Sequence, residues 1–484
     1  MSNQNTFSTD VDTIVGKADA AYRAWSRASR NERASVLRNV ADALDSQKEA
    51  LIATAQAETN LAAARLSGEF FRTTFQLRVF ADVIEEGSFL DARIDHQDPD
   101  WPMGARPDLR RTNQGVGPVI VYAASNFPFA FSVAGGDTAS ALAAGASVIL
   151  KAHAGHPELS RQTAAVIVQA LAEAGAPEGL FTLIEGREEG LQVLRDPRIK
   201  AGSFTGSIPG GRALFDVANS RDEPIPFFGE LGSINPSFVT QAASGIRAVE
   251  IADGFRASFT GSSGQICTKP GVLLVPRDSQ IIEELRESDF TDGQQMLNDR
   301  IHSGYTEVLN ELSTHPAVTV LAQGSDPLGN APSPTLLMTS LDSLIESRDE
   351  LFKECFGPTA LIGAYSNEHE LVRFAEAIDG QLTATVLGEE QDSIVPELVD
   401  ALREKAGRIL WNQWPTGVSV TDAQQHGGPY PATTAPSTTS VGTAAIYRFQ
   451  RPVAFQGFPQ GLLPDELVDT PHQDLTRRVN GKLA

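Results

Sequence analysis

Cysteine is scarce in this chain, which has only Cys267 and Cys355 among its 484 residues. Two cysteines cannot form a disulfide framework, so a reducing compartment fits the sequence and we expect a cytoplasmic protein. Each cysteine is then a free thiol, which serves either as a small buried hydrophobic residue or as a nucleophile.

Positive charge and long hydrophobic runs are also lacking. Lysine and arginine number 39 against 61 acidic residues, which gives a formal net charge of −22. Nucleic-acid binding needs a basic surface, so we expect no nucleic acid among the partners. The apolar runs, such as residues 119–124, fall far short of the roughly 20 residues of a membrane span, and we expect no membrane partner.

The glycine fingerprint G-x-G-x-x-G does not follow any apolar strand, so the sequence does not encode an ordinary Rossmann pyrophosphate turn. Short apolar segments instead alternate with helices rich in small residues, which predicts an α/β fold with parallel strands. The strands are expected at 119–122, 147–150 and 181–184, and the helices near 134–144 and 159–174. Ligands of such sheets bind beyond the carboxyl ends of the strands, where the loops 124–128, 151–153 and 204–207 follow.

The length of the chain predicts at least two domains, because one hydrophobic core stops growing at roughly 250–300 residues. Residues 11–59 have helical periodicity, and Ser29 and Glu32 form a predicted capping box. The stretch 95–113 is rich in proline and charge, which predicts a surface excursion. 

A second α/β unit is expected from Glu230 onward. Its first elements are a strand within 231–239, a helix near 246–260 and a strand at 272–275. Between that helix and the last strand lies Cys267, in a turn rich in glycine and hydroxyl groups. Glycine permits close approach of the backbone to a substrate, and backbone N–H groups beside the cysteine are suited to a developing oxyanion. Local sequence supports a nucleophile and a buried structural cysteine equally.

Two further residues fit a reaction at a carbonyl group. Glu230 is a lone carboxylate in an apolar segment, where burial is expected to raise its pKa toward neutrality and suit it to general-base work. A salt-bridged glutamate at a helix start is the structural alternative. Asn126 follows a predicted strand, and its amide can donate to an oxyanion; the alternative is a turn-forming asparagine.

Several motifs together resemble the aldehyde dehydrogenase superfamily. They are GQICTKPG around Cys267, FGELGSINP around Glu230, ASNFP around Asn126, FTGS at 204–207 and FKECFGP at 352–358, in the family's order and approximate spacing. The resemblance extends from the first predicted helix to the C-terminus. It implies a Rossmann-like cofactor domain at 1–229, an α/β catalytic domain at 230–436, and a small oligomerisation element formed by an arm at about 95–115 and the segment 437–484. A homodimer or homotetramer is expected.

The resemblance also implies a mechanism. The thiolate of Cys267 attacks an aldehyde, the oxyanion is held by Asn126 and the backbone N–H of the cysteine, and Glu230 activates the water that hydrolyses the thioester. No metal is implied. His426 lies near the cysteine in similar fatty-aldehyde dehydrogenases, or it belongs to a tight turn that closes the substrate tunnel; both hypotheses stay open.

The implied cofactor is NAD or NADP. In similar enzymes the cofactor is held at the positions of Lys151, Gly206, Ser207, Glu354 and Phe356. Three residues beyond the lysine, NAD-preferring relatives carry a glutamate, whereas this chain has Ala154. No carboxylate there repels a 2′-phosphate, and Arg187 is a candidate cation, so we expect NADP, with NAD as the alternative.

The segments 124–137, 151–157, 411–418, 426–433 and 440–446 resemble the 2,5-dioxopentanoate (α-ketoglutarate semialdehyde) dehydrogenase subgroup. Its dicarboxylic semialdehyde needs a cation for the distal carboxylate, and Arg72 is our candidate, with Phe127 also assigned to the substrate site. The aromatic residues Phe70, Phe71 and Phe75 instead favour an apolar tunnel, so a fatty-aldehyde dehydrogenase is the alternative.

Two other classes of protein share part of this pattern. A thiol hydrolase could use Cys267, His426 and Asn126 as nucleophile, base and orienting group, but it would leave Lys151 and Glu354 unexplained. A catalytically silent member of the fold is expected to lose the cysteine or Glu230, and both are present.

Overall fold

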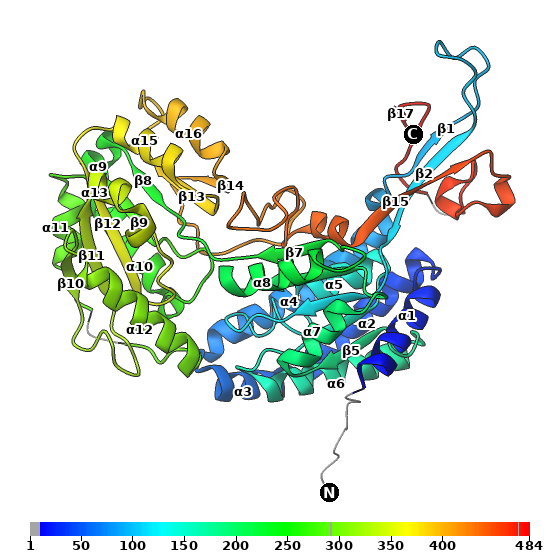
Figure 1. Ribbon diagram of the computed structural model, residues 1–484, viewed down its shortest axis with the longest axis horizontal. Helices are drawn as coiled ribbons and strands as arrows, with labels where there is room; N and C mark the ends of the chain where they lie inside the picture. Colours follow the sequence, from blue (N-terminus) through cyan, green and yellow to red (C-terminus); the bar gives the residue numbers. More distant parts are fainter. Residues whose placement is uncertain (1–9, 291–292, 473) are drawn as a thin grey trace, which may run out of the picture.

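The computed structural model describes residues 10–290, 293–472 and 474–484. Figure 1 shows two lobes that lie side by side and a narrow arm that projects from one of them. Each of these three parts is built on its own β-sheet. No helix in the described ranges is long and apolar enough to cross a membrane.

The chain begins with a group of helices that pack on the first lobe: α1 (Val11–Trp25), α2 (Arg30–Ser46), α3 (Lys48–Thr59) and α4 (Ala63–Glu86). The predicted capping box is confirmed, since the Ser29 hydroxyl accepts from the backbone N–H of Glu32 and the Glu32 carboxylate accepts from that of Ser29. Helix α4 buries one face in the core of the first lobe.

The first sheet has five parallel strands in the order β5-β4-β3-β6-β7. These are β3 (Val119–Tyr122), β4 (Val148–Lys151), β5 (Phe181–Ile184), β6 (Ala201–Thr205) and β7 (Phe227–Glu230). The connecting helices are α5 (Gly136–Ala144), α6 (Pro157–Glu173), α7 (Arg187–Arg195) and α8 (Ile208–Asn219). The strand order reverses between β3 and β6, which is where an α/β sheet of this kind binds its ligand.

The second sheet has seven strands in the order β10-β11-β12-β9-β8-β13-β14, and only β10 is antiparallel to its neighbour. The strands are β8 (Ser237–Val239), β9 (Val272–Pro276), β10 (Thr319–Gln323), β11 (Thr335–Ser340), β12 (Thr359–Tyr365), β13 (Gln381–Leu387) and β14 (Ala406–Trp411). The helices are α9 (Gln241–Ile246), α10 (Ala248–Thr260), α11 (Gln280–Arg286), α12 (Asp299–Thr314), α13 (Leu341–Glu346), α14 (Arg348–Leu351), α15 (His369–Ala377) and α16 (Val395–Arg403).

The strand expected within 231–239 is present, but it occupies only the end of that stretch. Residues 231–236 have no regular structure, and only Ser237–Val239 form β8. Asn235 has a left-handed φ of 54°, and Pro236 lacks the N–H that a strand needs, so both break the ladder. Glu230 is the last residue of β7 in the first sheet, rather than the start of the second unit.

The arm joins chain segments that are far apart in the sequence. Its sheet has the order β15-β2-β1-β16-β17, from β1 (Arg93–Asp95), β2 (Leu109–Gly115), β15 (Gln450–Gln456), β16 (Arg478–Val479) and β17 (Lys482–Leu483). The predicted excursion forms the exposed connection between β1 and β2. Residues 412–449 pass between the lobes before reaching β15, and an isolated bridge pairs Thr433 with Glu230 (Figure 1).

Candidate active site

The Cys267 loop follows α10 and a short 3₁₀ turn, η2 (Gly261–Gly264), and is fixed by buried polar side chains. The amide of Asn235 donates to the backbone oxygens of Cys267 and Lys269 at 2.8 and 2.9 Å. Lys269 in turn donates from Nζ to the carbonyl oxygens of Cys355, Gly357 and Thr359 at 2.6, 3.1 and 2.7 Å. These bonds set the direction of the cysteine side chain.

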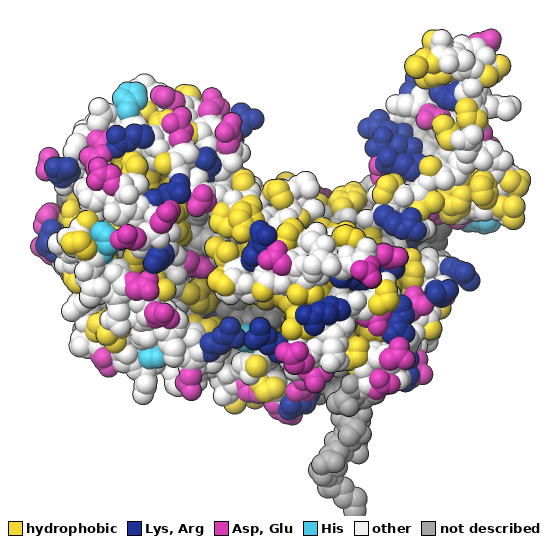
Figure 2. Space-filling model, viewed as in Figure 1, with side chains coloured by type: hydrophobic (Ala, Val, Ile, Leu, Met, Phe, Trp, Pro, Cys, Tyr) yellow, Lys and Arg dark blue, Asp and Glu magenta, His cyan; other side chains and the backbone are white. Residues whose placement is uncertain are grey.

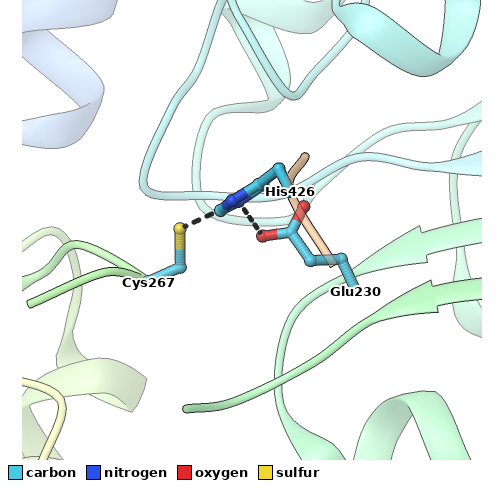
Figure 3. A group of neighbouring side chains, drawn as sticks. All are labelled: Glu230, Cys267 and His426. Atoms are coloured by element: carbon cyan, nitrogen blue, oxygen red, sulfur yellow. Dashed lines mark hydrogen bonds and ion pairs between the residues drawn. The ribbon is translucent and has the colours of Figure 1, made fainter. Parts of the chain in front are cut away.

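Three side chains from distant segments converge at the junction of the lobes (Figure 3). The Sγ atom of Cys267 lies 3.6 Å from Nε2 of His426. The same nitrogen lies 2.8 Å from Oε1 of Glu230. The loop, the end of β7 and the segment between the lobes thus each contribute one group to a Cys267–His426–Glu230 array.

Neighbours of the array hold its acid-base pair in place. Ser440 donates from Oγ to Oε2 of Glu230 at 2.5 Å and to the carbonyl oxygen of His426 at 3.1 Å. The backbone N–H of His426 donates to the hydroxyl of Thr439 at 2.8 Å. Glu230 and His426 are 3% and 1% exposed, so their mutual contact is shielded from water.

Burial by itself would raise the pKa of Glu230, but the charge of His426 and hydrogen bonds from His426, Ser440 and Cys267 outweigh it and lower the pKa. The expectation of a raised pKa is therefore wrong. The local sequence could not predict the shift, because His426, the partner of Glu230, lies 196 residues away in the sequence. Burial raises the pKa of the Cys267 thiol well above its ordinary value, and the negative charges of Glu230 and Glu354 raise it further.

Asn126 lies next to this array. Its side chain is buried and donates from Nδ2 to the carbonyl oxygen of Gln265 at 3.2 Å. A primary amide carries two N–H donors, so this bond orients the group while a second donor remains. Gln265 is two residues before the cysteine, which places Asn126 beside the loop that carries the thiol.

Arg72 on α4 also faces this junction. Both terminal nitrogens of its guanidinium are buried and have no hydrogen-bond partner in the described part of the chain. The group lies 5.2 Å from the ring centre of Phe131, which is itself 6.2 Å from the His426 ring. Burial lowers the pKa of Arg72, and the negative charges of Glu69, Cys267 and Glu230 counteract part of that shift. Arg72 is thus an unpaired cation beside the array.

The aromatic residues of α4 do not form one apolar wall, so they do not support the alternative of an apolar tunnel. Phe70 is buried and packs edge-on against Phe129, with ring centres 5.1 Å apart. Phe71 and Phe75 are 67% and 44% exposed and stack on each other. Phe127, by contrast, is half-buried next to Asn126 and packs against Phe131 with ring centres 5.5 Å apart.

The predicted cofactor residues lie at the carboxyl ends of the first sheet and beside them. Lys151 ends β4, and Gly206 and Ser207 form the exposed turn between β6 and α8. Ser207 is the N-cap of α8 and accepts from the backbone N–H of Gly210. An exposed turn at the start of a helix favours an anionic group. Figure 2 shows Lys and Arg side chains near the hollow where the lobes meet.

Two cations, Lys151 of β4 and Arg300 of α12, lie at the end of β4. The start of α12 contacts the next turn, since a Cβ on Gly155 would lie 3.0 Å from Nδ2 of Asn298. Burial, and then the charge of Arg300, lowers the pKa of Lys151, whereas Glu189 raises it. Arg187 is exposed at the first position of α7, with no ion pair to any described residue.

Glu354 lies on the other side of the array. Its carboxylate occupies the space left by the missing side chain of Gly232, and burial raises its pKa to about 7, although Lys269 and the backbone of Ser233 oppose that shift. Phe356 is half-buried two residues later. The turn at Gly206, the cations beside Lys151 and the Glu354 carboxylate offer groups for the phosphates and a ribose, so the residues fit a dinucleotide.

Sequence reasoning missed Ser440, Asn235, Lys269 and Arg300. Lys269 and Asn235 lay within the quoted motifs, but nothing in their local pattern shows that they bond to one loop from two sides. Ser440 and Arg300 reach their sites only through the tertiary fold.

Comparison with known proteins agrees with this site. A model of the aldehyde dehydrogenase family matches residues 2–430. The chain is 41% identical to an alpha-ketoglutaric semialdehyde dehydrogenase of Acinetobacter baylyi over 98% of this chain and 92% of that protein. It is also 41% identical to alpha-ketoglutaric semialdehyde dehydrogenase 2 of Azospirillum brasilense, over 98% and 91% of the two chains. The chain belongs to the aldehyde dehydrogenase family. 

Membership of this family makes the protein an oxidoreductase that converts an aldehyde into a carboxylic acid with NAD(P). The thiol hydrolase hypothesis is therefore wrong. Solved structures have the same fold. A 3,6-anhydro-L-galactose dehydrogenase superposes with a TM-score of 0.78 at 20% identity, covering 94% of this chain and 92% of that one. An NADP-dependent glyceraldehyde-3-phosphate dehydrogenase from Bacillus halodurans C-125 gives 0.77 at 22% identity, covering 93% and 91%.

Proposed function

We propose that this aldehyde dehydrogenase oxidises 2,5-dioxopentanoate to 2-oxoglutarate with NADP, through a thioester on Cys267. The observation that carries the substrate is the buried, unpaired guanidinium of Arg72 beside the array. The carboxylate at the other end of this five-carbon aldehyde is a suitable partner, because an unpaired buried cation is costly and a carboxylate can bind an arginine with two hydrogen bonds. The names of the two 41% identical relatives support the same substrate.

The array provides the acylation step. The Cys267 sulfur bonds to the aldehyde carbon, and the His426–Glu230 pair accepts the thiol proton. The second N–H of Asn126 and the backbone N–H of Cys267 donate to the resulting oxyanion. Loss of a hydride from the tetrahedral carbon leaves a thioester on the cysteine, and the thiol proton passes from the pair to solvent. NADP held by Lys151, Arg300 and the Gly206 turn would supply the hydride acceptor.

The same pair provides the hydrolysis step. Glu230, whose pKa is lowered, is ionised at neutral pH and removes a proton from the water that attacks the thioester. To reach that water the carboxylate must leave Nε2 of His426, 2.8 Å away, while Ser440 holds its other oxygen. The C–S bond breaks, the thiol recovers a proton and the acid is released.

Lys151 and Arg300 support NADP. Two cations repel each other, and the free energy of that repulsion is recovered when a phosphate dianion lies between them. The Bacillus halodurans neighbour is described as complexed with NADP. Arg300 rather than Arg187 is the cation close enough to act on Lys151.

The substrate proposal is tested by steady-state kinetics of Arg72→Ala with 2,5-dioxopentanoate and with pentanal. Losing a charge-assisted hydrogen bond costs about 1.5–3 kcal/mol, so kcat/KM for the charged aldehyde should fall by roughly 10- to 150-fold. Activity with pentanal should change little. Arg78→Ala is the matched control, because Arg78 lies on the same helix and pairs with Asp42 and Asp45 at the surface. An equal fall for both aldehydes would contradict the proposal and favour an aliphatic substrate.

The cofactor proposal is tested by titrating NADP and NAD against the enzyme without substrate. Arg300→Ala should weaken NADP binding by about tenfold or more and leave NAD nearly unchanged. Arg286→Ala is the control, since it removes an exposed arginine at the end of α11. Equal losses for both dinucleotides, or none, would contradict the assignment.

We also propose that the enzyme is a homo-oligomer. Strands β14 and β15 each lie at the edge of a sheet, with one side unpaired within the described chain. Open edges of this kind pair readily with a strand of another copy. Sedimentation equilibrium should give a mass of at least two chains.

A further inference from the structure

The Cys267–His426–Glu230 array offers a second use of its three donor atoms. Sulfur, imidazole nitrogen and carboxylate oxygen are the three kinds of protein ligand that Zn²⁺ binds. The Sγ, Nε2 and carboxylate oxygen atoms all lie within 4.8 Å of one another. In Figure 3 the cysteine and the carboxylate approach the same imidazole nitrogen from two sides.

The spacing of the sulfur and nitrogen atoms is close to that of a tetrahedral zinc site. Zn–S and Zn–N bonds of about 2.3 and 2.05 Å at a tetrahedral angle place the two ligand atoms about 3.5 Å apart. The observed separation of Sγ and Nε2 is 3.6 Å. Nε2 and Oε1 lie 2.8 Å apart because they share a proton, and they need to separate by only about 0.6 Å when a metal replaces that proton.

The charge of the array also favours a dication. A thiolate at Cys267 and the carboxylate of Glu230 would bring two negative charges within 4.8 Å of each other at one imidazole. One Zn²⁺ balances both negative charges and leaves a neutral cluster with a neutral imidazole, so no net charge is buried. Ser440 holds the second oxygen of Glu230 and leaves Oε1 directed at the array.

We propose that Zn²⁺ binds Cys267 Sγ, His426 Nε2 and Glu230 Oε1 and thereby inhibits the enzyme reversibly. The thiol proton passes to solvent, and the imidazole proton moves from Nε2 to Nδ1, which has no partner among the described residues. Cys267 is half-buried, so the fourth position of the metal faces the substrate side and takes water. The metal therefore competes with the aldehyde. Mg²⁺ and Ca²⁺ prefer oxygen ligands and do not bind this set.

The proposal is tested by titrating Zn²⁺, in competition with a chromogenic chelator, against the full-length enzyme without cofactor. Wild type should take up one tightly held ion per chain. Cys267→Ala should lose that ion, and Cys355→Ala, which removes the other thiol, should keep it. His426→Ala and His426→Gln should each weaken binding by at least about tenfold, as removal of one of three ligands requires.

Two further readouts report on the Cys267 sulfur itself. Co²⁺ bound to wild type and Cys355→Ala should give a sulfur-to-metal charge-transfer band, which Cys267→Ala should lack. Zn²⁺ should protect Cys267, located by peptide mass mapping, from iodoacetamide, and a chelator should restore both alkylation and turnover. Binding that survives in Cys267→Ala, or that stays at the wild-type level in both His426 variants, would show adventitious binding to surface carboxylates or to the thiol alone and would overturn the proposal.

Discussion

The two cysteines of this chain lie in loops that Lys269 joins, yet their surroundings differ. Cys355 is 5% exposed and its Sγ lies 4.0 Å from the carbonyl oxygen of Tyr305. Burial raises its pKa to about 11. Cys267 also has a raised pKa, but His426 and Glu230 lie within reach of its sulfur. Burial alone therefore makes a thiol inert. The adjacent His426–Glu230 pair makes Cys267 usable as a nucleophile.

The largest effect on turnover is expected when each of the two cysteines is replaced by alanine in a separate variant. Cys267→Ala should lower turnover by at least about 10⁴-fold, because no other group can form the thioester. Cys355→Ala should retain most of the activity, since that thiol has no base beside it. The measurement is steady-state formation of reduced cofactor, with dinucleotide binding as the control for folding. Equal losses in the two variants would remove the distinction between the loops.

Glu230→Gln should separate the two chemical steps. The amide cannot take a proton from water, so hydrolysis of the thioester should slow by about 10²- to 10⁴-fold. Rapid-mixing experiments should still show a burst of reduced cofactor, because His426 remains beside the thiol to accept its proton. A variant with normal steady-state turnover would show that another group activates the water.

The raised pKa of Cys267 predicts the pH dependence of its alkylation. In the enzyme without ligands the neutral thiol dominates, and only the thiolate reacts with iodoacetamide. The rate at Cys267 should therefore rise about tenfold per pH unit between roughly pH 7 and 9, with no plateau. Cys355 should react more slowly throughout. A plateau below pH 8 would instead indicate a stable thiolate–imidazolium pair.

The smallest effect concerns Ser440. Its hydrogen bond lowers the pKa of Glu230, so Ser440→Ala should raise that pKa and move the acidic limb of the kcat–pH profile to higher pH. Turnover at neutral pH should fall by up to roughly tenfold, as expected for one hydrogen bond to a charged group. Ser440→Thr keeps the hydroxyl and should restore the profile. An unshifted limb in both variants would mean that the serine is only structural.

The sequence predicted the local elements of the first lobe well. The strands expected at 119–122 and 181–184 coincide with β3 and β5. Apolar runs of this length between turn residues are too short for a buried helix and therefore predict strands. Within 231–239 the strand is confined to Ser237–Val239, because Asn235 and Pro236 interrupt the backbone before it. Secondary structure that depends on residues close together in the sequence can therefore be predicted from the sequence, and the Asn-Pro pair at 235–236 is such a local signal.

The predicted active-site residues also came together, but their electrostatics could not be read from the sequence. Cys267, Glu230, His426 and Asn126 meet as the motifs indicated. The sign of the Glu230 pKa shift depends on His426 and Ser440, which only the fold brings to the end of β7. Long-range partners decide a pKa, whereas a motif identifies only the group that titrates.

Mass spectrometry of Glu230→Gln, mixed with NADP and 2,5-dioxopentanoate and quenched in acid, tests the central claim most directly. The account predicts one added acyl group per chain, located on the peptide that contains Cys267 and absent from the peptide that contains Cys355. Reduced cofactor without any adduct, or an adduct on Cys355, would contradict it.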